Sequence, residues 1–180
     1  LIRWQLYHAI ADTLLKLGYA NPKAFKIVKD LRMVWKKRSA DEAFRTYEIQ
    51  LVKAYEQVLK TLNFDQFEEA ATIVFEEHKD QVYTYTRDLI KNLKERGYLL
   101  FAISGSQLEV VQKIADYYGF DDCVGSVYER GKNGFTGKVT TTRQGKHLIL
   151  DQLVKKHGAT YTGSIAVGDS EGDITMLEAV

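Results

Sequence analysis

The sequence predicts an α/β protein in which a bundle of helices precedes a parallel sheet with right-handed crossovers. Residues 1–80 carry apolar side chains at helical spacing. After about residue 80, short apolar runs alternate with amphipathic segments that end at glycines, which gives the order strand, helix, strand. The 180 residues are enough for one domain, or for one domain with a small insertion.

The helical part contains four periodic segments with short connections, which predicts an antiparallel bundle. The first segment occupies residues 1–17. The second begins at Asn21 and Pro22, because asparagine is a good N-cap and proline suits the first helical position. The third begins at Ser39–Glu42, which has the spacing of a capping box, and the fourth begins at Asn63.

The α/β part begins with a helix that Gly97 closes. The solid apolar run at residues 98–103 predicts a strand that is covered on both faces. Ser106–Glu109 has the spacing of a capping box and predicts the start of the next helix. A second strand is expected at residues 123–127.

The remaining elements continue this alternation. Asn133 and Gly134 form a dipeptide that is typical of β-hairpin turns. A helix is expected from about Gly145 to Lys156. The short apolar run at residues 164–167 predicts a third, buried strand.

The composition is that of an ordinary globular protein. Hydrophobic residues make up 45% and charged residues 27%, and the net charge of +1 favours neither nucleic acid nor a membrane. No signal peptide is visible, and no apolar run approaches the roughly 20 residues of a membrane span. The one cysteine, Cys123, cannot form an internal disulfide, which fits a reducing cytosol. We therefore expect a cytoplasmic protein.

The ends of the chain suggest a fragment. The chain has no initiator methionine, and it stops at Val180, where a helix has just begun. We therefore expect it to be incomplete at both ends.

The acidic turn from Gly168 to Asp173 follows the third expected strand. Asp169 stands where the strand ends, and Asp173 stands where a helix begins. Two carboxylates on one tight turn suit a hard cation that prefers oxygen ligands. Alternatively, Ser170 and Asp173 only cap the helix.

Two further residues could contact an anion at the same edge of the sheet. Ser104 follows the first strand, and its hydroxyl, together with the backbone N–H of Gly105, could form a small anion cradle. Lys146 lies in the first turn of its helix, where a cation opposes the helix dipole. Such a placement suggests that the ammonium group meets an anion, and the alternatives are an ordinary turn serine and a solvated lysine.

In this order, Ser104, Lys146 and the Gly168–Asp173 turn resemble three motifs of the haloacid dehalogenase superfamily of phosphohydrolases. The resemblance covers nearly the whole chain and is closest to the phosphoserine-phosphatase-like branch. It implies a Rossmann-like three-layer α/β core at residues 81–180. It also implies that residues 1–80 are a helical-bundle cap, inserted between the first two motifs of the family.

One motif of the family is missing. Its first strand ends in Asp-x-Asp, which supplies the nucleophile and an acid/base, and no such pattern occurs in the 180 residues. Leu1 resembles the position just after that motif. The resemblance therefore implies that the nucleophile lies upstream of Leu1, and that these residues alone are inactive.

For the complete protein, the resemblance implies Mg²⁺-dependent hydrolysis of a phosphomonoester through an aspartyl-phosphate. Asp169 would bind Mg²⁺, and Asp173 would bind it or orient its surroundings. Ser104 and Gly105 would hold phosphoryl oxygens, and Lys146 would neutralise their charge. The cap would select a small phosphorylated metabolite, such as a phosphoserine-like compound, a sugar phosphate or a nucleotide.

Two other interpretations remain open at this point. The chain could belong to a catalytically silent relative whose helical cap binds proteins. A response-regulator-like receiver domain also combines a parallel sheet, an acidic pocket, a Ser/Thr and a lysine. The large helical insertion before Ser104 and the late position of the acidic turn argue against the receiver.

Overall fold

The computed structural model describes residues 1–37, 42–142 and 145–180, which form two compact units. The helical unit consists of Ile2–Gln81 and Tyr128–Lys138. The sheet unit consists of Leu1, Val82–Val127 and Val139–Val180. Among the described residues, no helix is long and apolar enough to span a bilayer.

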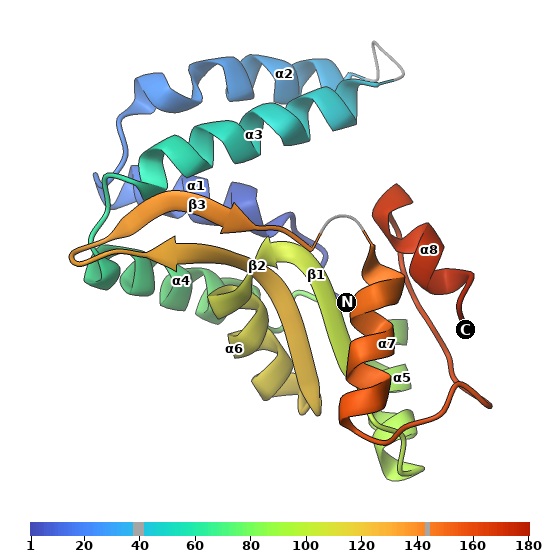
Figure 1. Cartoon of the computed structure of the whole chain (residues 1–180). Helices are drawn as coiled ribbons and strands as arrows, with labels where there is room; N and C mark the ends of the chain where they lie inside the picture. The colour runs from blue at the N-terminus through green and yellow to red at the C-terminus, as the bar shows by residue number, and fades with distance from the viewer. Residues whose placement is uncertain (38–41, 143–144) are drawn as a thin grey trace. The chain divides into compact units, whose positions relative to one another are not determined.

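The described residues of the helical unit form five helical segments (Figure 1): α1 Leu6–Lys16, the 3-10 helix η1 Pro22–Phe25, α2 Lys26–Lys36, α3 Ala43–Leu59 and α4 Phe64–His78. Helix α1 packs against α3 and α4, and α2 packs against α3. The Asn21 side chain accepts a hydrogen bond from the Lys23 N–H, and Asn63 forms a capping box with Gln66. Both predicted helix starts are confirmed, whereas the predicted capping box at Ser39 lies outside the described residues.

The hairpin segment Tyr128–Lys138 packs with these helices. The Tyr128 and Tyr7 hydroxyl oxygens lie 3.1 Å apart in the core of the unit. The Phe135 ring makes edge contacts with Phe64 and Phe67, at centroid distances of 5.5 and 5.3 Å. The helical unit is therefore built from two segments that are far apart in the sequence.

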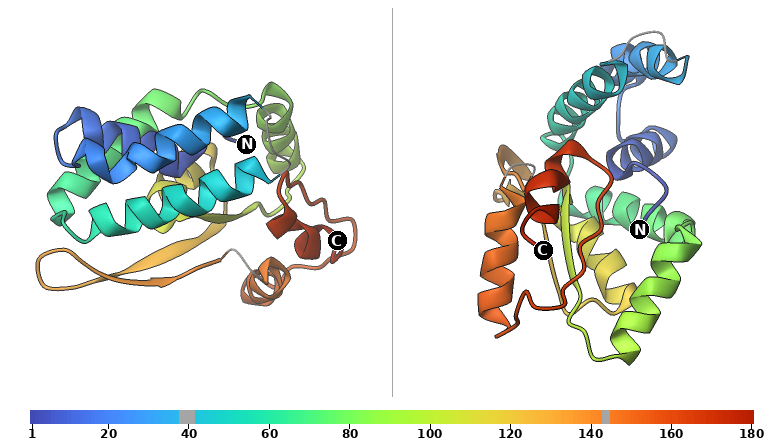
Figure 2. Two further views of the ribbon diagram at one scale, coloured as in Figure 1. Left: turned by 90° about the horizontal axis from the view of Figure 1, so that it is seen from above. Right: turned by 90° about the vertical axis from the view of Figure 1, so that its right-hand side faces the viewer.

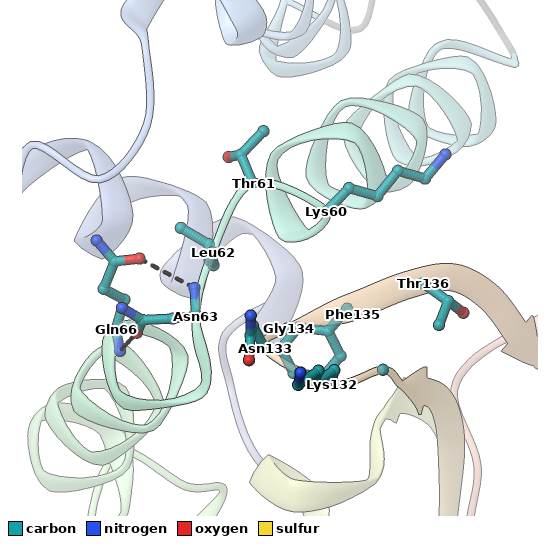
Figure 3. Close-up of a pocket in the computed structure, with 11 residues that line it drawn as sticks. Lys60, Thr61, Leu62, Asn63, Gln66, Lys132, Asn133, Gly134, Phe135 and Thr136 are labelled. Atoms are coloured by element: carbon teal, nitrogen blue, oxygen red, sulfur yellow. Dashed lines mark hydrogen bonds between the residues drawn. The ribbon is translucent and has the colours of Figure 1, made fainter.

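The hairpin tip also meets the connection between α3 and α4. The hollow between them has a volume of about 440 Å³ and is open to solvent, with Lys60, Asn63 and Gly134 among its lining residues (Figure 3). At Gly134, a Cβ atom would lie 2.4 Å from the Leu62 carbonyl oxygen. The backbones are so close there that only glycine fits.

Up to α7, the sheet unit follows the predicted α/β order: α5 Thr84–Glu95, β1 Phe101–Gln107, α6 Leu108–Tyr118, β2 Asp122–Arg130, β3 Phe135–Thr140 and α7 Lys146–Lys156. The 3-10 helix η2 Glu171–Asp173 and α8 Ile174–Leu177 follow. The strand order is β1-β2-β3, and β1 runs parallel to β2. Strands β2 and β3 continue into the helical unit and end in the predicted hairpin, where the Gly131 N–H donates to the Gly134 carbonyl. Figure 2 shows α7 and α8 side by side. The α/β class with a parallel sheet is confirmed.

Apolar contacts and one charged cluster hold the sheet unit together. Phe120 packs against two small groups of buried residues, and these groups are Ile90, Leu93 and Leu100, and Val111, Ala115 and Cys123. At the start of β2, the Asp122 Oδ2 lies 2.7 Å from the Lys156 Nζ and 2.7 Å from the His157 Nε2. Hydrogen bonds from His157 and Lys156 hold the pKa of Asp122 below its usual value.

Two predictions about strands are wrong. Residues 164–167 are not a strand: Ile165 and Val167 are 52% and 55% exposed, and no strand pairs with them in the described part of the chain. An apolar run becomes a strand only where a neighbour accepts its backbone hydrogen bonds. The first strand begins at Phe101 and is half-buried over most of its length, rather than covered on both faces.

The end of β1 also differs from the prediction. Ser104 lies inside β1, which continues to Gln107, and α6 begins directly after it. Gln107 is the N-cap of α6, and its side chain makes no capping hydrogen bond. The capping box predicted at Ser106–Glu109 is therefore wrong, because the strand extends through its first residue.

Candidate active site

Lys146 and Asp173 form a buried ion pair in the sheet unit. The Lys146 Nζ lies 2.5 Å from the Asp173 Oδ1, and the two residues are only 7% and 6% exposed. Lys146 is the first residue of α7, where the helix dipole opposes a cation. The Asp173 carboxylate offsets the unfavourable interaction of the Lys146 ammonium group with the helix dipole. The ammonium group therefore contacts a carboxylate of the chain itself, and the alternative of a solvated lysine is wrong. That it meets an anion of a ligand stays a prediction.

Asp173 also holds the turn that precedes it. Its Oδ2 accepts hydrogen bonds from the backbone N–H groups of Asp169 and Ser170, at 3.2 and 3.0 Å, and from the Ser170 hydroxyl at 2.7 Å. Burial alone would raise the pKa of Asp173, but hydrogen bonds from Lys146 and Ser170 outweigh burial, and the pKa lies below its usual value. Asp173 is therefore ionised at neutral pH. Its hydrogen bonds with Ser170 form a capping box at the start of η2.

Gly168 allows this turn to close on Asp173. A Cβ atom at Gly168 would lie 2.5 Å from the Asp173 Cβ and 2.8 Å from its Cγ. Real Cβ atoms do not approach carbon so closely, so a larger residue would push the carboxylate away. The Asp169 side chain, next in the chain, is exposed. The turn thus has one buried carboxylate, that of Asp173, which is directed inward, and two carboxylates at the surface, those of Asp169 and Glu171.

Ser104 lies in a bulge of β1. Ile103 pairs with Val124 and Gln107 pairs with Ser126, so a step of four residues in β1 faces a step of two in β2. The extra residues leave the regular ladder, and such bulges redirect side chains.

The bulge lies beside the ion pair. The Lys146 Nζ is 3.3 Å from the Ile103 carbonyl oxygen, the residue just before Ser104. The Ser104 Oγ accepts a hydrogen bond from the Ser106 N–H at 3.2 Å, and the hydroxyl keeps its own proton to donate. The structure therefore brings the backbone next to Ser104 together with Lys146 and Asp173.

A family model of haloacid dehalogenase-like hydrolases matches residues 1–178. The chain belongs to this family. A phosphoserine phosphatase of Streptomyces coelicolor is 30% identical over 96 residues, which are 52% of this chain and 23% of that protein. A phosphoserine phosphatase of Methanocaldococcus jannaschii is 32% identical over 96 residues, which are 51% of this chain and 44% of that protein. The predicted resemblance to the phosphoserine-phosphatase-like branch of the family is confirmed.

Two solved structures share the fold of this chain. A substrate-bound phosphoserine phosphatase complex has a TM-score of 0.67 at 22% identity, covering 99% of this chain and 77% of that one. A protein of unknown function from Bordetella pertussis has a TM-score of 0.69 at 16% identity, covering 91% and 73%. The chain spans less than half the length of the curated relatives it matches.

The carboxylate oxygens of the Gly168–Asp173 turn differ in how well they could bind a cation. In the described part of the chain, no group of three or more His, Cys, Asp or Glu side chains gathers as a metal site. The exposed carboxylate of Asp169 fits one ligand of a hydrated cation. The Asp173 oxygens, by contrast, already accept hydrogen bonds from Lys146, Ser170 and the Asp169 backbone. Asp173 therefore fits a supporting role better than direct ligation.

Two residues near Ser104 were not foreseen from the sequence. The buried hydroxyls of Ser126 and Thr142 donate to the backbone carbonyls of Gly105 and Ser104. No sequence pattern marks either residue, because each acts on a bulge whose register only the sheet defines. The three-dimensional site is thus larger than the three motifs.

Proposed function

We propose that the whole protein is a metal-dependent phosphomonoester hydrolase and that this chain carries most of its phosphate site. The observation that supports it best is the buried ion pair of Lys146 and Asp173 beside the Ile103 carbonyl. A buried cation held by a carboxylate beside the bulge of β1 is a preorganised charge, and preorganised charge is a large term in catalysis of phosphoryl transfer.

Each candidate site residue has a role in this proposal. The Ser104 hydroxyl and the Gly105 backbone hold phosphoryl oxygens at the bulge. Lys146 neutralises negative charge that the phosphoryl group shares with the attacking carboxylate, and Asp173 keeps the ammonium group in place.

Mg²⁺ fits the exposed carboxylate of Asp169, which prefers a hard cation. When bound, it would supply positive charge to the phosphoryl oxygens. Asp173 holds the Asp169 backbone through a hydrogen bond of 3.2 Å and so orients the ligand without binding the cation. This assigns different roles to the two acidic residues.

The nucleophile is proposed to lie outside these residues, since the 180 residues contain no Asp-x-Asp. Its carboxylate oxygen would attack phosphorus, the alcohol would leave, and water would then cleave the aspartyl-phosphate to give inorganic phosphate. Residues 1–80 would act as the cap that selects a small phosphorylated metabolite, such as a phosphoserine-like compound, a sugar phosphate or a nucleotide.

The test is hydrolysis of p-nitrophenyl phosphate by the full-length gene product, with Mg²⁺ and with EDTA. We expect turnover that needs the metal, and we expect Asp169→Ala to remove this metal dependence more completely than Asp173→Asn. Thr13→Val, a buried substitution in α1, is the control for general effects of mutation.

Two results would contradict the proposal. Absence of turnover on any phosphomonoester would favour a catalytically silent relative whose helices bind proteins. Equal Mg²⁺ dependence in the wild type and in Asp169→Ala would remove Asp169 from the metal site.

A further inference from the structure

Two buried hydroxyl groups bind the backbone of the bulge in β1. The Thr142 hydroxyl donates to the Ser104 carbonyl, and the Ser126 hydroxyl donates to the Gly105 carbonyl at 2.8 Å. Thr142 is 5% exposed and Ser126 is 1% exposed. A buried hydroxyl is unfavourable unless it is hydrogen-bonded, and these two hydroxyls are bonded to consecutive peptide groups.

The bulge needs these donors because it lies outside the strand ladder. Between Ile103 and Gln107 the register of β1 against β2 shifts, so the carbonyls in between have lost their regular positions. Buried carbonyls are nearly always paired. Here the partners come from side chains: Lys146 at the Ile103 carbonyl, and Thr142 and Ser126 at the next two.

A planar peptide group transmits each of these bonds to the opposite side. The C=O of one residue and the N–H of the next point in opposite directions in the same plane. The Ser126 bond to the Gly105 carbonyl therefore also directs the Ser106 N–H, which donates to the Ser104 Oγ at 3.2 Å. The Thr142 bond to the Ser104 carbonyl likewise sets the direction of the Gly105 N–H.

Strand β2 is held close enough to make these contacts by a glycine. A Cβ atom at Gly125 would lie 2.6 Å from the Leu108 Cα and 2.9 Å from the Ser106 carbonyl oxygen. The backbones of β2 and of the bulge are therefore nearly in contact, and Gly125 permits the close approach that brings Ser126, the next residue, to the Gly105 carbonyl.

We propose that Ser126 and Thr142 are positioning residues for the phosphoryl group. Ser126 sets the Ser104 hydroxyl through the Ser106 N–H, and Thr142 sets the backbone N–H of Gly105. Neither residue touches the substrate. The inference rests on the proposed function in one respect, since it takes Ser104 and Gly105 as the groups that hold phosphoryl oxygens.

The test compares variants that keep shape but lose the hydroxyl with one that keeps the hydroxyl. In the full-length protein, Thr142→Val and Ser126→Ala should each lower kcat/KM for p-nitrophenyl phosphate by roughly tenfold or more, because small misplacements of positioned groups have effects of at least that order. Thr142→Ser, which retains the donor, should stay within about threefold of the wild type by the same argument. Thr13→Val removes a buried hydroxyl from α1 and should leave kcat/KM unchanged.

Amide hydrogen exchange, followed by NMR, measures the positioning itself and needs no turnover. The Ser106 amide should exchange faster in Ser126→Ala, and the Gly105 amide should exchange faster in Thr142→Val, while Thr142→Ser and Thr13→Val match the wild type at both amides. If the wild type hydrolyses no phosphomonoester, the proposed function fails and the exchange rates alone decide the positioning.

The positioning role is overturned if Thr142→Val and Ser126→Ala exchange at wild-type rates. It is also overturned if Thr142→Ser loses as much kcat/KM as Thr142→Val. The packing of the methyl group, and not the donated hydrogen bond, would then be what matters.

Discussion

The two units of the chain bury polar groups in different ways. Among the described residues classed as buried and polar, one lies in the helical unit and the rest lie in the sheet unit: Thr13 in the former, and Gln107, Ser126, Thr142, Lys146 and Asp173 in the latter. Burial of such groups is unfavourable unless they are paired. Five of these six residues therefore lie in the unit that contains the candidate site.

The helical unit shows the alternative. Its core contains the aromatic residues Tyr7, Tyr55 and Tyr128, with the Tyr55 ring 5.1 Å from Tyr7 and 6.0 Å from Tyr128. Tyr128 bonds to Tyr7 through the hydroxyls, and burial raises the pKa of Tyr128. Polar tips of aromatic side chains that pair with one another serve packing. In this chain the buried hydroxyls of Tyr7 and Tyr128 contact each other, whereas the buried ion pair and the hydroxyls that bind backbone carbonyls lie at the candidate site.

Lys146→Met should have the largest effect. It leaves the buried Asp173 carboxylate without its cation, which should lower the free energy of unfolding by about 3–5 kcal/mol and also abolish turnover. Relief of the unfavourable helix-dipole interaction alone would predict a small gain in stability. The sign of the change in the free energy of unfolding therefore shows whether the ion pair or the dipole dominates. Urea denaturation measures the change. Lys155→Met, at the exposed end of α7, is the matched control and should change stability by less than about 1 kcal/mol. Equal stability of Lys146→Met and the wild type would show that the pair makes no net contribution to stability.

Gly168→Ala should have the next largest effect. The new Cβ atom would overlap Asp173, at 2.5 Å from its Cβ, and the strain should lower the free energy of unfolding by about 1–3 kcal/mol. The displaced carboxylate should also reduce turnover. Thermal unfolding and kcat measure both, and a normal kcat in Gly168→Ala would mean that the turn tolerates the displacement of Asp173.

Tyr128→Phe tests the helical unit and should have a smaller effect. The substitution keeps the ring and removes the hydroxyl that contacts the Tyr7 hydroxyl, so the free energy of unfolding should fall by about 0.5–1.5 kcal/mol. Turnover should not change, because this hydroxyl serves packing. A loss of kcat comparable to that of Gly168→Ala would break the distinction between the two units.

The smallest effect is a dependence on pH at Asp122. Hydrogen bonds from His157 and Lys156 lower the pKa of Asp122 in the folded protein from its unfolded value of 3.8. The unfolded state then binds more protons, so this stabilisation is present above pH 3.8 and is lost as the pH falls through the folded pKa. Melting temperatures of the wild type and Asp122→Asn should differ at pH 6 and converge towards pH 2. A constant difference over this range would contradict the assignment.

Local sequence chemistry predicted much of the fold. Asn63 and its capping box, the hairpin at Asn133 and Gly134, and the parallel pairing of β1 with β2 all depend on residues close in sequence or on the order of elements. The unfavourable position of Lys146 on its helix even predicted that an anion would meet it, although it did not identify Asp173 as that anion.

The rest depended on which groups meet across the fold. The apolar pattern at Ile165–Val167 predicts a strand, but it says nothing of a partner strand, and none pairs with this segment in the described residues. Ser126 and Thr142 are ordinary small polar residues until the bulge in β1 brings two carbonyls to them. A shift of register is a property of two strands together and leaves no mark on either sequence alone.

The discontinuous helical unit limits how this protein can be divided or recombined. A cut after Gln81 looks natural in the sequence, but it would separate Tyr7 from Tyr128 and the rings of Phe64 and Phe67 from Phe135. A graft of residues 2–81 onto another core would therefore expose aromatic surface that this chain covers with its own later hairpin. The exchangeable module is the set of helices together with residues 128–138, and a chimera that transfers both keeps its core intact.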